Sequence, residues 1–168
     1  MEQFVMQAAG RVVAVTALYA STRQYCKDYL CEGEPDFSVE ITPEDIAVEQ
    51  DFADREHALE GLPVRKMNGQ VLERTALQRK LAEKLFTYDT QLFHGSVIAV
   101  DGEAYLFTAK SGTGKSTHTR LWREMLGDKA VMVNDDKPFL RVMDDHVLVY
   151  GSPWNGKHGL GCNMCVPL

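Results

Sequence analysis

A glycine-rich segment with two lysines and four hydroxyl residues is the part of this 168-residue chain best suited to chemistry. It reads Ala109-Lys110-Ser111-Gly112-Thr113-Gly114-Lys115-Ser116-Thr117, which is G-x-x-x-x-G-K-[ST] with alanine in the first glycine position. Glycines let backbone N–H groups approach phosphates closely, and a following helix would direct its N-terminal N–H groups at the same anion. The pattern predicts a nucleoside triphosphate site in which Lys115 reaches the β- and γ-phosphates and Ser116 ligates Mg²⁺.

The segments on either side of this loop occur in the order that such a site requires. Residues 104–108 form a short apolar and aromatic run typical of a buried strand. Downstream, Leu121, Trp122 and Met125 are apolar positions at helical spacing, and Gly127 supplies a stop. The alternative is an ordinary glycine-rich turn between a strand and a helix, but the placement of the lysine and the hydroxyl favours nucleotide binding.

A pair of adjacent aspartates indicates which kind of reaction to expect at this site. Residues 130–134 read as another buried strand, and Asp135 and Asp136 follow it directly. Carboxylates at the end of a strand beside a phosphate loop can hold the metal or accept a proton from an attacking hydroxyl. Because neighbours on an extended segment point to opposite sides, we expect the two acids to have different roles. A solvated turn before Lys137-Pro138 is the alternative.

A histidine is the third feature. His94-Gly95 opens a predicted strand at residues 96–100, and Asp101-Gly102 then makes a two-residue hairpin turn. The hairpin returns the chain, so His94 is expected near the end of the strand that bears the loop. A lone histidine is more often a structural hydrogen-bonding residue, whereas a position beside phosphates would suit charge stabilisation or proton handling.

Together these three features resemble the HPr kinase/phosphorylase family and its relatives on the phosphoenolpyruvate carboxykinase-like nucleotide-binding fold. In that family a His-Gly begins a strand, a hairpin leads into the phosphate loop, and a later strand ends in Asp-Asp. By this resemblance Lys115 binds phosphate, Ser116 and Asp135 hold Mg²⁺, Asp136 or Asp135 is the base on the acceptor hydroxyl, and His94 supports the transferred group. The resemblance implies an α/β nucleotide-binding domain with a mixed sheet, helices on its faces and a P-loop.

The chain also departs from that family. Ala109 and Lys110 replace a glycine and an acidic residue, and Lys137-Pro138-Phe139 stands where arginine is common. The chain ends at Leu168, before the glycine-rich signature tied to phosphorolysis and the helices that engage HPr. We therefore expect a bacterial HPr-kinase-like protein of unassigned substrate, truncated at its C-terminus. The resulting unpaired strand edge would make a second copy of the chain a candidate partner.

The predicted function is transfer of the γ-phosphoryl group from ATP or GTP, with Mg²⁺, to a hydroxyl of a protein serine or of a small molecule. A glycine-rich loop at residues 151–159, after a predicted strand at 147–150, is a candidate acceptor loop that contains Lys157 and His158. Two alternatives stay open. One is a nucleotide-binding regulatory module without turnover, and the other is a carboxykinase-type enzyme.

The charge and the composition of the chain argue against some other classes of function. The formal net charge of −6 argues against a nucleic-acid or anionic-membrane surface. The sequence contains neither an apolar run of membrane-spanning length nor a signal-peptide pattern, so we expect a cytoplasmic protein. The cysteines are Cys26, Cys31, Cys162 and Cys165. We interpret them as reduced, small apolar residues, with a loosely spaced zinc site as the alternative.

The domain organisation is predicted from the coarse pattern of elements. Residues 1–68 form an N-terminal α/β portion and residues 69–168 the loop-bearing core, unless both belong to one continuous domain. Strands are expected at residues 11–16 and 37–41, with helices from Ser21 to near Leu30, from Thr42 onward, and over 71–88.

Overall fold

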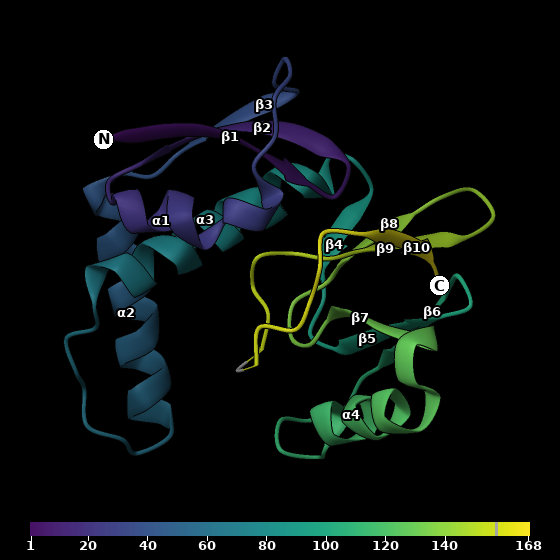
Figure 1. Ribbon diagram of the computed structural model, residues 1–168. Coiled ribbons are helices and arrows are strands. Elements are labelled where there is room, and N and C mark those ends of the chain that lie inside the picture. Colours follow the sequence, from purple (N-terminus) through teal and green to yellow (C-terminus); the bar gives the residue numbers. More distant parts are fainter. Residues whose placement is uncertain (157) are drawn as a thin grey trace. The chain divides into compact units, whose positions relative to one another are not determined.

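The computed structural model describes residues 1–156 and 158–168 and has an α/β architecture, as predicted (Figure 1). It divides into two compact units: Met1–Gln7 with Val12–Leu81, and Ala8–Arg11 with Ala82–Leu168. The boundary expected after residue 68 precedes the third helix, whereas the units divide within that helix. Among the described helices, none combines the length and the apolar character needed to cross a membrane.

The N-terminal unit is built on a three-stranded sheet ordered β1-β2-β3. Its elements are β1 (Glu2–Ala8), β2 (Arg11–Ala17), α1 (Ala20–Tyr25), β3 (Phe37–Glu40), α2 (Pro43–Leu59) and α3 (Gly69–Phe86). β2 and β3 are parallel, so the chain between them, which contains α1, is a crossover connection. The start of α2 is as predicted: Thr42 and Asp45 form a capping box, and Pro43 occupies the first turn.

The start of α1 differs from the prediction. The helix was expected from Ser21, but Tyr19 is its N-cap, and the Tyr19 side chain makes no capping hydrogen bond. The carboxylate of Glu73, fully buried on α3, instead accepts hydrogen bonds from the N–H groups of Leu18 and Tyr19 and from the hydroxyl of Thr22. This acceptor comes from more than fifty residues away in the chain, so a local sequence pattern could not reveal it.

The second unit carries the glycine-rich loop on a three-stranded sheet ordered β6-β5-β7. Its strands are β5 (Ser96–Val100), β6 (Glu103–Phe107) and β7 (Ala130–Asn134), and β5 is antiparallel to both neighbours. The predicted hairpin turn is confirmed, since Asp101 and Gly102 both have positive φ, at 50° and 89°. β6 and β7 therefore run in the same direction, and both end at the edge where β5 begins.

A second sheet of this unit has the order β10-β9-β8-β4, and all of its neighbouring strands are antiparallel. Its strands are β4 (Thr90–Leu92), β8 (Phe139–Val142), β9 (Val147–Tyr150) and β10 (Cys165–Pro167). Three small sheets thus replace the single sheet of mixed direction that was expected. Short connections such as the Asp101–Gly102 turn give antiparallel pairs, whereas a parallel pair needs a longer crossover.

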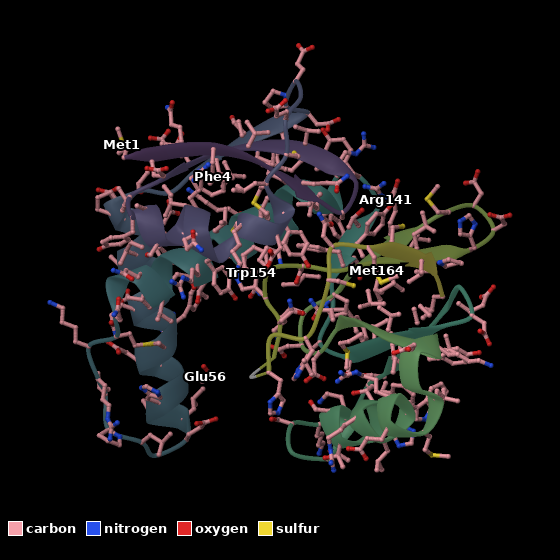
Figure 2. All side chains as sticks on the ribbon, viewed as in Figure 1. Met1, Phe4, Glu56, Arg141, Trp154 and Met164 are labelled. Atoms are coloured by element: carbon pink, nitrogen blue, oxygen red, sulfur yellow. The ribbon has the colours of Figure 1, made fainter. Side chains whose placement is uncertain are left out.

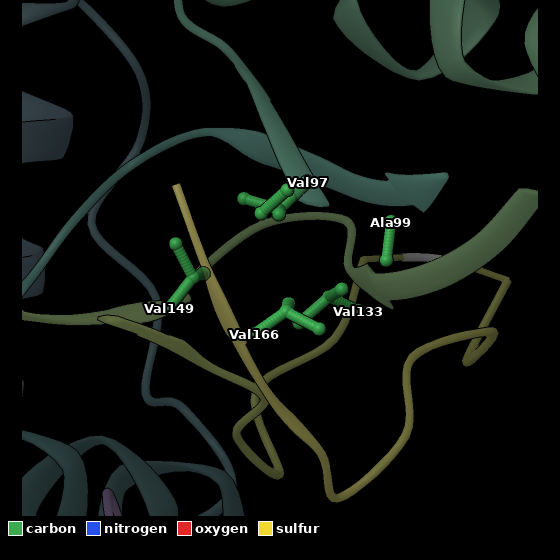
Figure 3. Packing of buried hydrophobic residues seen from close by; sticks show 6 residues of the cluster. Val97, Ala99, Val133, Val149 and Val166 are labelled. Atoms are coloured by element: carbon green, nitrogen blue, oxygen red, sulfur yellow. The ribbon is translucent and has the colours of Figure 1, made fainter. Parts of the chain in front are cut away.

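The core of this unit lies between its two sheets. Val97 of β5 and Val133 of β7 pack with Val149 of β9 and Val166 of β10 (Figure 3). α4 (Lys115–Leu126) contacts β5 and β7, and the ring of Trp122 lies against the rings of Tyr105 and Phe107 of β6. Because side chains alternate along a strand, the residues of β6 that meet α4 are not those that face the core cluster.

Candidate functional site

A cavity of about 730 Å³ lies at the edge of the β6-β5-β7 sheet where β6 and β7 end and β5 begins. Its lining contains His94, Ser111, Gly112, Gly114, Lys115, Ser116, Thr117, Asp135, Asp136, Asn155, Gly156 and His158. The structure therefore brings together most of the residues that the sequence singled out. Ala109, Lys110 and Thr113 belong to the loop but not to this lining, and Lys157 lies outside the described residues.

The glycine-rich loop depends on backbone conformations that favour glycine. Gly112 and Gly114 have φ of 78° and 100°, in the left-handed region, and Gly114 is the N-cap of α4. The Nζ of Lys115 donates to the carbonyl oxygens of Ala109, at 2.8 Å, and of Lys110, at 3.4 Å. The loop thus curves around an ammonium group and places it beside the first turn of a helix, an arrangement that suits an anion.

Asp135 has the surroundings expected of a metal ligand. Its side chain is 8% exposed, and its Oδ1 accepts a hydrogen bond of 2.6 Å from the hydroxyl of Ser96. The Ser96 Oγ is also 3.0 Å from the Oγ1 of Thr119 on α4. No cationic side chain of the described residues lies within 4 Å of this carboxylate. Asp135 and Ser116 both line the cavity, and carboxylate and hydroxyl oxygens are ligands that Mg²⁺ accepts.

Asp136 has different surroundings from its neighbour. It is half-exposed, and its Oδ1 lies 3.5 Å from the Nε2 of His94. Its backbone is fixed because the side-chain oxygen of Asn134 accepts hydrogen bonds from the N–H groups of Asp136 and Lys137, at 2.9 and 2.7 Å. The two aspartates therefore differ in burial and in partners, as the extended pattern suggested.

Three residues that shape the site were missed by the sequence interpretation: Ser96, Thr119 and Asn134. Ser96 and Thr119 are polar positions in elements that were interpreted only as a buried strand and a helix. Asn134 is the last residue of β7, as predicted, and asparagine before a turn commonly bonds to the backbone N–H groups that follow. That preference was the one available signal.

The loop after β9 closes one side of the cavity. Trp154, which is labelled in Figure 2, is buried. Its ring meets that of Phe139 of β8 edge-on, with 6.5 Å between the ring centroids. Asn155 donates from Nδ2 to the carbonyl oxygen of Ser152, while its Oδ1 is buried and has no hydrogen-bond partner within residues 1–156 and 158–168. The anchored Trp154 thus holds Asn155 and Gly156 against the Asp135 side of the cavity.

Replacing Gly156 with alanine is expected to displace Asp135 and to lower the free energy of unfolding by about 1–3 kcal/mol. A Cβ at this position would lie 3.0 Å from Oδ2 of Asp135 and 3.2 Å from its backbone oxygen. Urea denaturation of Gly156→Ala, Asp135→Ala and the double variant measures the effect. The cost should be smaller in the Asp135→Ala background, which removes the carboxylate, and an equal cost in both backgrounds would show that the contact with the carboxylate is not responsible.

The four cysteines are free thiols and take no part in the cavity lining. Burial raises the pKa of Cys26 to about 12, against the opposing charge of Arg74, and burial also raises the pKa of Cys162. Cys165 is the first residue of β10. The raised pKa values of Cys26 and Cys162 make these two thiols poor nucleophiles.

Comparison with known proteins adds no assignment, since no family model and no curated protein matches the chain. The chemistry of the cavity is therefore the basis for any functional conclusion. It combines a loop with a lysine ammonium, a buried carboxylate beside a serine hydroxyl, and a histidine–aspartate pair at one sheet edge.

Proposed function

We propose that this protein binds ATP or GTP with Mg²⁺ and transfers the γ-phosphoryl group to a hydroxyl of a protein serine or of a small molecule. We further propose that its second unit has an HPr-kinase-like, phosphoenolpyruvate carboxykinase-like fold. The observation that carries the proposal is the presence of Lys115, Asp135 and Asp136 in the lining of one cavity. A volume of about 730 Å³ is in the range of small-molecule sites.

In this proposal the loop binds the polyphosphate. Backbone N–H groups at Gly112 and Gly114 and at the start of α4 face the phosphate oxygens, because neither glycine has a Cβ to keep them away. The ammonium of Lys115 exchanges its loop carbonyls for β- and γ-phosphate oxygens. Ser116 and Asp135 hold Mg²⁺, which supplies neutralisation of the charge on those oxygens when it is bound.

Asp136 is the proposed base. Its exposed carboxylate takes the proton of the acceptor hydroxyl, whose oxygen attacks the γ-phosphorus while the bond to the β–γ bridging oxygen breaks and the nucleoside diphosphate leaves. His94, 3.5 Å from Asp136, orients that carboxylate and lies beside the transferred group. Asp135 is less suited to this role, because its carboxylate is buried and already bound to Ser96.

The His94–Asp136 pair favours an enzyme over a binding module. A module that only holds a nucleotide needs the loop and a metal ligand, and it has no use for an exposed acid and imidazole in the same cavity. A carboxykinase-type reaction would need a further site for a dicarboxylate, and among the residues that the structure describes in this lining, Lys115 is the one permanent cation.

Calorimetric titration of the protein with ATP and GTP tests the nucleotide step. With Mg²⁺ present, micromolar binding of at least one of the two is expected, and chelation of the metal should weaken it by about tenfold or more. AMP, which lacks the β- and γ-phosphates, should bind at least about a hundredfold more weakly. The absence of heat with any purine triphosphate would refute the proposal, and binding without transfer of labelled γ-phosphate to any hydroxyl acceptor would favour the module.

A further inference from the structure

A second cavity, of about 350 Å³, adjoins the first one along α4. It shares Ser116, Thr117, Asp135 and His158 with the larger cavity. His94, Asp136 and Lys115 line only the larger cavity, so the smaller one leads away from the proposed site of transfer. It is also of a size that could hold part of a nucleotide.

Two arginines of α4 line the smaller cavity, and among the described residues only one of them is paired with a carboxylate. Ser116, Arg120 and Arg123 are spaced by four and three residues, so they follow one another along one helix face. The Nη1 of Arg120 pairs with Oε1 of Glu124 at 3.0 Å. Arg123 is half-buried and has no carboxylate or hydrogen-bond acceptor for its side chain within the described part of the chain. Its guanidinium is therefore available to a ligand.

The remaining lining is partly apolar. Met132 of β7 is buried, and Leu160 comes from the loop after β9. Flat heteroaromatic rings bind well between apolar side chains, and methionine sulfur makes favourable contacts with them. The guanidinium of Arg123, which has no partner among the described residues, lies beside the apolar side chains of Met132 and Leu160. A purine bound there would displace water and receive hydrogen bonds from the guanidinium.

The direction of phosphoryl transfer links this cavity to the nucleotide. The attacking and leaving oxygens lie roughly in line on opposite sides of the γ-phosphorus. If the acceptor approaches on the Asp136 side, the rest of the nucleotide must extend to the other side, past Ser116 and Thr117. The smaller cavity begins at those two residues.

We infer that the smaller cavity is the nucleoside subsite and that Arg123 recognises the base there, with a preference for guanine. This inference rests on the proposed function. A guanidinium has only donors, and guanine presents two adjacent acceptors, O6 and N7, whereas adenine presents one acceptor and one donor at the same edge. Arg123 is thereby a specificity-determining residue for the nucleotide.

Calorimetry with Mg²⁺ and three probes, GDP, ADP and inorganic tripolyphosphate, tests this inference. The natural protein should bind GDP about fivefold or more tightly than ADP. Arg123→Gln should reduce that preference to less than about twofold and leave tripolyphosphate binding unchanged. Arg120→Gln is the matched control: it removes an arginine from the same helix face that already has a partner, and it should keep the preference.

Three outcomes would overturn the inference: no preference for GDP in the natural protein, an unchanged preference in Arg123→Gln, or an equal loss of tripolyphosphate and GDP binding in that variant. The last result would place Arg123 on the phosphates. These results differ from a failure of the proposed function, in which tripolyphosphate and both nucleotides would fail to bind the natural protein. Because Arg123 has no partner among the described side chains, its replacement should leave the melting temperature unchanged, which checks the fold.

Discussion

Replacing Lys115 with methionine is expected to lower phosphoryl transfer by roughly 10²–10³-fold and to weaken triphosphate binding more than diphosphate binding. The Lys115 ammonium lies inside the curve of the glycine-rich loop, 2.8 Å from the Ala109 carbonyl oxygen, so it can turn from the loop to the phosphates. Methionine keeps much of the length of the side chain but removes the charge and its three donors. Single-turnover transfer and calorimetry with ATP, GTP and their diphosphates measure the two effects.

Lys129→Met provides the control for this variant. Lys129 is exposed, lies beyond the end of α4 and lines neither cavity. Its replacement changes the net charge by the same amount as Lys115→Met but leaves the loop intact. Transfer and affinity should stay within about twofold of the natural protein. If Lys115→Met and Lys129→Met behaved alike, the loop would not be a phosphate site.

Asp135→Asn is expected to abolish the effect of Mg²⁺ while leaving the unliganded fold intact. The asparagine oxygen can still accept the 2.6 Å hydrogen bond from Ser96, so the free energy of unfolding without ligand should change by no more than about 1 kcal/mol. An amide is a poor Mg²⁺ ligand compared with a carboxylate, and transfer should fall by roughly 10²–10³-fold.

Thermal melts in the presence and absence of Mg²⁺ and nucleotide separate these two effects. In the natural protein, ligand at about a hundred times its dissociation constant should add about 2.7 kcal/mol of stability. Most of that gain should vanish in Asp135→Asn and persist in Asp144→Asn, which alters an exposed aspartate in the β8–β9 connection. A full Mg²⁺-dependent gain in Asp135→Asn would assign the metal to other residues.

Local sequence patterns predicted the elements of the site with little error. β5, β7 and β9 have the predicted limits at residues 96–100, 130–134 and 147–150, and the Asp101–Gly102 turn has the predicted conformation. These are short apolar runs bounded by residues with strong turn preferences, so the information lies within a few residues of chain.

Local sequence patterns could not predict the contacts between segments that are distant in the sequence. The Ser96–Asp135 hydrogen bond joins residues thirty-nine positions apart. The Glu73 carboxylate that holds the start of α1 is more than fifty positions from its partners. The division into three sheets likewise depends on which strands meet, and hydrophobic periodicity does not encode strand partners. The proposed roles of Asp135 and Asp136 depend on how far each carboxylate is buried and on its hydrogen-bond partners, and only the folded structure gives these.

The Asp101–Gly102 turn lies at the end of the β5–β6 hairpin that is remote from the cavity. It joins β5 and β6 at the ends opposite to Ser96 and Phe107, which are paired at the cavity edge. Both turn residues are exposed, and a Cβ on Gly102 would meet nothing within 4 Å. The φ of 89° at Gly102 would strain any other residue, so additions belong beside this glycine and not in its place. Extra residues, a fluorophore or even new termini could be introduced there while the reactive groups keep their positions, which makes this turn the natural attachment point for a reporter of ligand occupancy.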